Sequence, residues 1–517
     1  MAHDWKAELL TLGFELAETH ISHVFLRGDE VYKLKRPVAL GFLDFSSLEL
    51  RERACLAEVE LNRRLAPDVY LGVVALVRDE PGQLTFVPRP AVERPRVLEW
   101  AVHMRRLRDS DRADSMLAAG ELGVADVERL ATAIARFHQR APCNEATTQY
   151  GMPARILQNV QENFGQVEHS VLSFLRPDER EHLFAYQTWF LERHAPLFIE
   201  RARAGRVRDG HGDLRLEHCY RDPSGGFLII DCIEFNERFR FGDVCADLAF
   251  LAMDLCHHDR VDLAELLVAA YARESGDYGI YDVLDFYQSY RAVVRAKVSS
   301  LLASDEEVRA STRERACSEA RRYYLLGLAA AGRALAPTRL IVSFGLIASG
   351  KSALACALAA ELALPVVSAD LTRKQLLNSD PTDPHREAAF QGAYGERMTE
   401  RVYEELLARA AHVLASGRSV VLDASFRSRA QRERARALAL RTGAVPIFFE
   451  CRCARNAAME RLARRAREPS VSDGRAEIYD EFAACFEPAD ELSDREHLVL
   501  DTEQPLERTV EAARARL

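Results

Sequence analysis

The sequence lacks the features that mark several classes of protein. No apolar run in its 517 residues approaches the length that spans a bilayer, and the first residues lack the apolar core of a signal peptide. The 11 cysteines form no C-x-x-C pair, which speaks against a disulfide framework. We therefore expect a cytoplasmic protein whose cysteines are reduced and mostly buried.

Also absent are internal repeats, low-complexity segments and an excess of positive charge. The chain carries 69 Lys and Arg against 79 Asp and Glu, a formal net charge of −10. This balance argues against general nucleic-acid binding and against a protein of the membrane surface. It does not exclude nucleotides, because one local cationic loop can bind them. The length and the 48% hydrophobic content predict about two to four domains with sizeable cores.

The clearest motif begins two-thirds of the way along the chain. Residues 345–352 read G-x-x-x-x-G-K-S, the pattern of a phosphate-binding loop, between an apolar run and leucines at helical spacing. In such a loop the backbone N–H groups face an anion, Lys351 adds a positive charge at the outer phosphates, and the Ser352 hydroxyl can ligate Mg²⁺. The residues expected to contact the nucleotide are Gly345, Ser349, Gly350, Lys351 and Ser352.

Alternating strand-like and helix-like segments follow this loop. Such alternation predicts a parallel sheet with crossover helices, and ligands of such sheets bind at the carboxyl ends of the strands. Asp370 and Asp423 both stand where apolar runs end. Asp423 fits an aspartate that binds Mg²⁺ directly or through water, and Asp370 is placed to accept the proton of an acceptor hydroxyl.

A second group of candidate residues lies in the first two-thirds of the chain. Residues 211–213 read His-Gly-Asp and occupy a predicted loop before a hairpin, at whose far end stands Asp231. Two carboxylates that are distant in sequence but close in space suit a proton acceptor and a metal ligand, although either could be a simple turn residue. Asp243 and Asp247 are expected to be loop anchors rather than catalysts.

The order of this loop, hairpin and aspartate resembles aminoglycoside-phosphotransferase-like kinases over most of residues 1–330. The resemblance implies a bilobal protein-kinase-like fold that uses ATP and Mg²⁺. Asp213 would be the base that accepts the proton of the substrate hydroxyl, and Asp231 would bind Mg²⁺. Lys33 would contact the nucleotide phosphates, with Lys35 as the alternative.

Further nucleotide contacts follow from the same resemblance. Glu58, on a helix predicted over residues 46–65, would pair with the strand lysine, with Glu60 as the alternative. Residues 99–102, beginning with Glu99, would form the hinge that contacts adenine. Taken alone, the lysine and the glutamate could equally be solvated surface charges.

One position departs from the family pattern. His218 stands five residues after Asp213, where the family has an Asn that binds the second metal ion. Imidazole is a poorer ligand than an amide oxygen for Mg²⁺. The first site could therefore use one metal ion, bind the metal differently, or transfer phosphate weakly.

The C-terminal part resembles small P-loop kinases such as gluconate kinase, zeta toxin and the polynucleotide 5′-kinase domain. In those families an aspartate after the second strand contacts the acceptor, and Asp370 with Arg373 matches it. A helical lid supplies arginines to the transferring phosphate, and Arg461 and Arg465 match that lid. Arg427, just beyond the Mg²⁺-binding aspartate, is a further candidate. Each arginine could instead lie on a solvated helix face.

Taken whole, the chain is similar to a bacterial fusion of these two kinase types. We expect residues 1–335 to form an α+β, protein-kinase-like domain and residues 336–517 an α/β P-loop domain with helices on both faces of a parallel sheet. The leading hypothesis is an ATP- and Mg²⁺-dependent phosphotransferase that acts on a hydroxyl of a small molecule, with two nucleotide sites.

Two other hypotheses are left open. In the first, the protein is a regulatory ATPase whose N-terminal domain only senses nucleotide. In the second, it is a 5′-hydroxyl kinase of nucleic acid, which the acidic balance disfavours. The sequence names neither the acceptor nor the oligomeric state.

Overall fold

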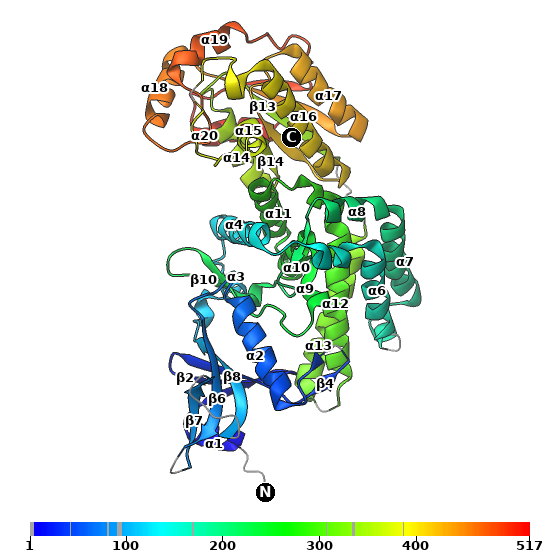
Figure 1. Cartoon of the computed structure of the whole chain (residues 1–517). Coiled ribbons are helices and arrows are strands. Elements are labelled where there is room, and N and C mark those ends of the chain that lie inside the picture. The colour runs from blue at the N-terminus through cyan, green and yellow to red at the C-terminus, as the bar shows by residue number, and fades with distance from the viewer. Residues whose placement is uncertain are drawn as a thin grey trace. The chain divides into compact units, whose positions relative to one another are not determined.

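The computed structural model describes residues 5–41, 43–79, 82–89, 96–167, 170–306, 308–332, 337–385 and 387–517. The chain divides into two compact units (Figure 1): unit 1 is residues 1–257 with 290–325, and unit 2 is residues 258–289 with 326–517. The boundary expected between residues 335 and 336 lies outside the described residues and stays a prediction.

Unit 1 begins with a six-stranded sheet of strand order β1-β2-β3-β8-β6-β7. The predicted hairpin is confirmed, because β2 and β3 pair antiparallel across a turn at Gly28, whose φ is +58°. Helix α2 packs on β6 and β8 and buries Cys55 and Val59 against Trp100. The elements of this first part of unit 1 are α1 (Trp5–Thr11), β1 (Glu15–Glu18), β2 (Ser22–Arg27), β3 (Glu30–Lys35), β4 (Ala39–Leu40), β5 (Leu43–Asp44), α2 (Leu48–Asn62), β6 (Tyr70–Arg78), β7 (Leu84–Pro88) and β8 (Val97–Arg105).

The rest of unit 1 is mostly helical and carries short hairpins. Helix α10 is buried along nearly its whole length, as a helix at the centre of a helical lobe must be. The elements are α3 (Ala113–Ala118), α4 (Val124–Arg140), α5 (Glu145–Thr148), α6 (Pro153–Gly165), α7 (Pro177–Arg193), α8 (Ala195–Arg203), β9 (Val207–Asp209), β10 (Cys219–Arg221), β11 (Phe227–Ile229), α9 (Glu237–Arg240), β12 (Phe241–Asp243), α10 (Val244–His257), α12 (Leu284–Ser304) and α13 (Ala310–Ala330). Both α12 and α13 cross a boundary between the units along the chain.

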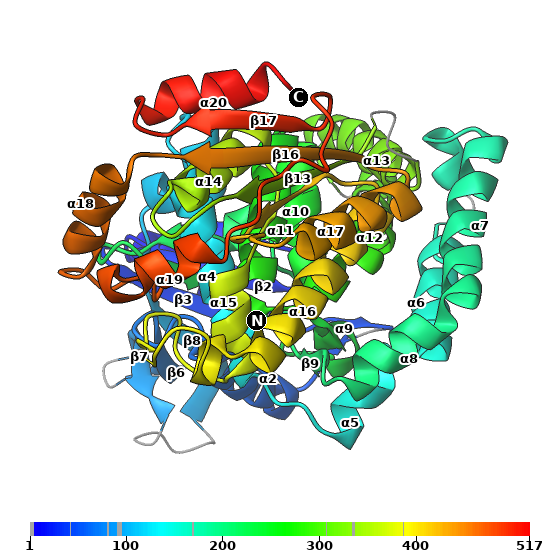
Figure 2. The same ribbon diagram turned by 90° about the horizontal axis from the view of Figure 1, so that it is seen from above.

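Unit 2 is built on a five-stranded sheet of order β14-β15-β13-β16-β17, and every neighbouring pair in it is parallel, as the sequence predicts. Ile341, Val421 and Phe449 are buried between the sheet and its helices. Figure 2 shows α20 beside β17, the strand at one edge of the sheet. The elements are β13 (Arg339–Phe344), α14 (Lys351–Leu362), β14 (Val366–Ser368), α15 (Ala369–Leu376), α16 (Glu396–Ala415), β15 (Val420–Asp423), α17 (Arg429–Thr442), β16 (Val445–Arg452), α18 (Arg455–Arg465), α19 (Tyr479–Ala484), β17 (His497–Asp501) and α20 (Leu506–Arg514).

One segment from earlier in the chain belongs to unit 2. Residues 258–289 contain α11 (Val261–Ser275) and a short 3₁₀ helix, Tyr278–Asp282. The Tyr278 hydroxyl donates to the carbonyl of Val366 at 2.8 Å, and the amide of Gln375 donates to the carbonyl of Arg273 at 3.0 Å. These bonds fasten the segment to β14 and α15.

Among the described residues, the 11 cysteines form no disulfide. Only five of them are buried, and four are exposed, so the expectation of mostly buried thiols is wrong. Among the described residues, no helix combines the length and the apolar character that crossing a membrane requires.

Candidate active sites

The loop predicted to be catalytic in unit 1 is hydrogen-bonded to side chains of helix α10. Asp247 of this helix accepts hydrogen bonds from the backbone N–H groups of His211 at 2.6 Å and Gly212 at 2.9 Å. Two turns further along the helix, Asp254 accepts from the N–H of Leu216 at 2.9 Å. Buried carboxylates that satisfy loop N–H groups fix the loop in one conformation. The anchoring role predicted for Asp247 is confirmed.

Asp213, in this loop, is held by the side chain of Arg215. Its two carboxylate oxygens accept from Nε at 3.0 Å and from Nη2 at 2.9 Å, which is a two-point, charge-assisted pair. Burial raises the pKa of Asp213, but Arg215 and His218 outweigh burial and hold the pKa well below its usual range. Asp213 is therefore an anion at neutral pH and suits the orientation of a hydroxyl group more than early removal of its proton.

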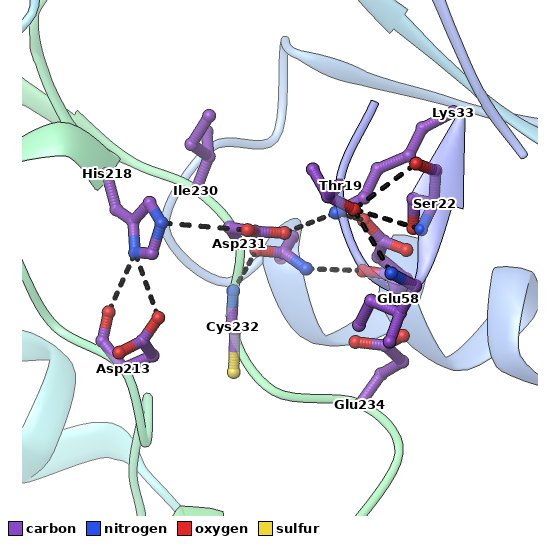
Figure 3. Close-up of polar contacts among 12 residues, drawn as sticks. Thr19, Ser22, Lys33, Glu58, Asp213, His218, Ile230, Asp231, Cys232 and Glu234 are labelled. Atoms are coloured by element: carbon purple, nitrogen blue, oxygen red, sulfur yellow. Dashed lines mark hydrogen bonds and ion pairs between the residues drawn. The ribbon is translucent and has the colours of Figure 1, made fainter. Parts of the chain in front are cut away.

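Asp231 follows the hairpin of β10 and β11 with a left-handed backbone, at a φ of +66°. Non-glycine residues in this region store strain, and they cluster at functional sites. The carboxylate, 42% exposed, faces Lys33 on one side and His218 on the other (Figure 3). Burial raises the pKa of Asp231, but Lys33 first and then His218 lower it to well below the usual range.

Lys33 connects Asp231 to Glu58. Its Nζ lies 2.8 Å from Oε1 of Glu58 and pairs with Oδ1 of Asp231. Lys35 lies 2.5 Å from the other oxygen of Glu58 and pairs with Glu234. Glu58 is fully buried, so its charge requires these two lysines. Of the two candidate lysines, Lys33 is the one that contacts Asp231, and the alternative glutamate, two residues after Glu58, is exposed.

Glu99 lies inside β8, and its position corrects one expectation. Its buried carboxylate accepts from Nε of Arg51 at 2.8 and 2.9 Å. Residues 101 and 102 pair with β3 on one side and with β6 on the other, and β8 runs on to Arg105. Backbone groups shared with two neighbouring strands are not available to adenine. Residues 99–102 are therefore strand and not hinge, and the connection to the helical part begins after Arg105.

Arg295 and Tyr323 belong to the surroundings of the Asp213–Arg215 pair without being part of any sequence motif. Arg295, on α12, contributes to the low pKa of Asp213. Its guanidinium lies over the ring of Tyr323 at 5.6 Å, and its Nε has no hydrogen-bond partner among the described residues. Both side chains come from helices about 80 to 110 residues beyond the loop, and no local motif marks them.

The phosphate-binding loop of unit 2 has the backbone that its glycines predict. Gly345 has a φ of +145°, and a Cβ there would lie 2.5 Å from the carbonyl oxygen of Cys451. The loop is held from outside by Arg461, which donates to the carbonyl of Ala348 at 3.0 Å, and by Thr502, which donates to that of Ser349 at 2.6 Å. Arg461, expected to contact the transferring phosphate, is thus occupied with loop carbonyls.

Asp423 lies beside Lys351 and Ser352, as the two motifs predict. Burial raises the pKa of Asp423, and Lys351 and a hydrogen bond with the Ser352 side chain oppose this only in part. Oδ1 of Asp423 and Oγ of Ser349 are buried and have no hydrogen-bond partner among the described residues. Buried polar atoms of this kind call for an explanation, and a bound ion or ligand supplies one.

The candidate acceptor residues of unit 2 surround the start of α15. Nη1 of Arg373 lies 3.8 Å from Asp370, and its guanidinium lies over the ring of Tyr394 at 4.3 Å. Arg427 lies over the ring of Phe390 at 4.4 Å. Arg465 donates to the Ser472 hydroxyl at 3.4 Å and contributes to the electrostatics of Asp423.

A buried ion pair close to these residues was not foreseen. Nζ of Lys374 lies 2.9 Å from Oδ2 of Asp473, and both side chains are nearly inaccessible to solvent. Asp473 also accepts from the Tyr394 hydroxyl at 2.9 Å and from the N–H of His385 at 3.0 Å. The pair fastens the segment after α18 to α15. Its members lie 99 residues apart, so no sequence pattern pairs them.

Comparison with known proteins gives a family for the chain. Residues 340–489 match the family model described as AAA domain. The chain is 33% identical, over 96% of its length and 94% of theirs, to uncharacterized protein Rv2004c of Mycobacterium tuberculosis and uncharacterized protein Mb2027c of Mycobacterium bovis.

Solved structures similar to the chain include two kinases. Choline kinase LicA from Streptococcus pneumoniae is 13% identical, with 63% of this chain and 99% of that chain covered and a TM-score of 0.35. A gluconokinase from Sinorhizobium meliloti is 21% identical, with 35% and 91% covered and a TM-score of 0.26. The chain carries a region that matches the AAA domain model, and it belongs to the same family as the two mycobacterial proteins.

Proposed function

We propose that the protein is an ATP- and Mg²⁺-dependent phosphotransferase that acts on a hydroxyl of a small molecule, with one nucleotide site in each unit. The observation that carries the proposal is the connected set Glu58–Lys33–Asp231 beside the loop of Asp213. A lysine paired with a buried helix glutamate and with a metal-binding aspartate is the arrangement that positions nucleotide phosphates in protein-kinase-like sites.

In unit 1, each member of this set has a proposed role. Lys33 holds nucleotide phosphates, and Glu58 keeps its ammonium in position. Asp231 with His218 would hold a divalent ion, which would neutralise the charge of the phosphates. Asp213 orients the acceptor hydroxyl. The hydroxyl oxygen forms a bond to the γ-phosphorus, the bond from that phosphorus to ADP breaks, and the hydroxyl proton passes to Asp213.

In unit 2, the phosphate-binding loop takes the nucleotide. Lys351 would contact the outer phosphates, and Ser352 with Asp423 would hold the ion, which accounts for the unpartnered oxygen of Asp423. Asp370 would accept the hydroxyl proton. Arg373, Arg427 and Arg465 are proposed to contact the acceptor or the transferring phosphate, whereas Arg461 supports the loop.

Two observations favour a second candidate function, in which unit 1 binds nucleotide without transferring phosphate. The two-point pair with Arg215 makes Asp213 a weak base, and His218 replaces the family's metal-binding Asn. Such a unit would sense nucleotide, and unit 2 would hydrolyse ATP in a regulatory role.

ATP turnover by four forms of the protein separates the two candidates. The forms are the wild type, Asp213→Ala, Lys351→Ala and the double variant, each measured with and without a pooled metabolite extract. We expect each single change to remove a separate part of the turnover that the extract stimulates. If Lys351→Ala abolishes all turnover and Asp213→Ala changes nothing, the sensor function is correct and the two-site phosphotransferase is wrong.

A further inference from the structure

We propose that His218 and Asp231 form a divalent-metal site with one nitrogen and one oxygen ligand, which prefers a first-row transition ion such as Mn²⁺ to Mg²⁺. The inference rests on the proposed function of unit 1, since nucleotide phosphates and water would complete the coordination. Three observations carry it: one hydrogen bond, one distance and the exposure of one carboxylate.

The hydrogen bond fixes the tautomer of His218. Nδ1 lies 2.8 Å from the backbone carbonyl oxygen of Asp213. A carbonyl oxygen can only accept, so Nδ1 must carry the proton and donate it. In the neutral imidazole, Nε2 is then left with a lone pair, and this is the form in which a histidine ligates a metal.

The distances show what Nε2 faces. Oδ2 of Asp231 lies 3.6 Å away, whereas Oε1 of Glu217, at 3.7 Å, is already paired with the guanidinium of Arg215. Figure 3 shows His218 between Asp213 and Asp231, with the imidazole directed at both. A nitrogen lone pair and a carboxylate oxygen that face each other repel, and a cation bound by both relieves this repulsion.

The distance between the two ligand atoms suits a bound metal ion. Two ligands that are each about 2.1 Å from a common metal lie about 3.0 Å apart at a right angle and about 3.4 Å apart at a tetrahedral angle. The observed separation of 3.6 Å between Nε2 and Oδ2 requires only a small closure. The carboxylate of Asp231 is 42% exposed, so the position is open to solvent and to a nucleotide.

The ligand types decide which ion is preferred. Mg²⁺ takes oxygen ligands almost exclusively, whereas imidazole nitrogen suits first-row transition ions. Among the described residues, no group of three His, Cys, Asp or Glu side chains could hold an ion unaided. The ion would therefore bind together with the nucleotide. The histidine that weakens the site for Mg²⁺ makes it selective for another ion.

The test measures metal binding directly. Full-length protein in a Lys351→Ala, Asp423→Ala background, in which the second site is disabled, is mixed with a non-hydrolysable ATP analogue and titrated with Mn²⁺. Free Mn²⁺ is followed by electron paramagnetic resonance, and Mg²⁺ is added as the competitor. We expect His218→Asn to lower the preference for Mn²⁺ over Mg²⁺ by about tenfold or more. We also expect the ¹⁴N coupling of bound Mn²⁺ to be present in the parent and lost in the variant.

The controls keep the outcomes distinct. His20→Asn changes an exposed histidine of unit 1 and should leave the preference unchanged. If His218→Asn does not fold, His218→Gln is measured in its place. An unchanged preference and no ¹⁴N coupling would mean that Nε2 carries a proton and forms an ion pair with Asp231, which overturns the metal site alone. Absence of any analogue binding to the parent overturns both this site and the proposed function of unit 1.

Discussion

The single carboxylate of Glu58 is the shared counter-ion of two lysines. It is fully buried, and its two oxygens face Lys33 and Lys35 separately. Burial raises the pKa of Glu58, but the lysines outweigh burial, and the net pKa is lowered. Removing the charge of one member of such a buried group leaves the others uncompensated.

We therefore expect Glu58→Gln to destabilise the protein by about 3 kcal/mol, because two buried ammonium groups lose their shared counter-ion. Denaturant unfolding of the wild type and the variant measures this difference. Glu60→Gln is the matched control, since that side chain lies exposed on the same helix, and we expect its effect to stay within about 0.5 kcal/mol. Equal effects of the two changes would show that the lysines are balanced by other groups.

The phosphate-binding loop is an element whose shape depends on close approach between two backbones. At Gly345 a side chain would have to occupy the space of the Cys451 carbonyl, which belongs to the neighbouring strand β16. The loop cannot move away without breaking the bonds that Arg461 and Thr502 make to it. The same packing that holds the loop open for phosphate leaves no room for a methyl group.

Gly345→Ala should therefore abolish nucleotide binding by unit 2. It should also destabilise the protein more than a Gly→Ala change at a position that has a positive φ but no steric clash. Gly443→Ala provides the comparison, because Gly443 has a φ of +72° but nothing within 4 Å of its Cβ position. We expect about 1–2 kcal/mol for Gly443→Ala and more for Gly345→Ala. The measurements are unfolding and titration with a fluorescent ATP analogue, in an Asp213→Ala, Lys33→Ala background. Normal binding by Gly345→Ala would refute the requirement for this backbone.

Unit 2 is discontinuous along the chain, and Arg418 shows why. Its guanidinium pairs with Glu265 at 2.7 Å and with Asp285 at 2.8 Å. Both partners lie in residues 258–289, which come before the last part of unit 1 in the sequence. Burial lowers the pKa of Arg418, but Glu265 and Asp285 raise it well above the usual range, so the group stays charged.

Arg418→Gln should lower the stability of unit 2 by about 2 kcal/mol, because two partly buried carboxylates lose a charged hydrogen-bond donor. Limited proteolysis and thermal unfolding of the full chain measure the effect. Arg434→Gln removes a guanidinium from a more exposed pair, with Glu400, and should cost about 1 kcal/mol at most. If Arg418→Gln costs no more than this control, residues 258–289 are not held to unit 2 by these ion pairs.

Much of both candidate sites could be predicted because their motifs are local. Eight consecutive residues define the phosphate-binding loop, and the loop at 211–213 stands within 20 residues of Asp231. The hairpin at Gly28 and the parallel sheet also follow from short patterns of apolar and turn residues. Each of these features depends on the conformation of only one or two neighbouring elements, so the local pattern of residue types is enough to predict it.

The remaining features depend on which charges meet when the elements pack. The chain has 69 Lys and Arg side chains and 79 Asp and Glu side chains, and nothing local selects Lys374 for Asp473, which lies 99 residues away. The resemblance to kinases places Glu99 in a hinge, and only the pairing of β8 with strands on both sides excludes the hinge. Residues 258–289 are helical in either unit, and their ion pairs with Arg418 assign them to unit 2. A buried charge without a partner is costly, so the packing of the elements decides which charged side chains pair. No single segment of the sequence contains this information.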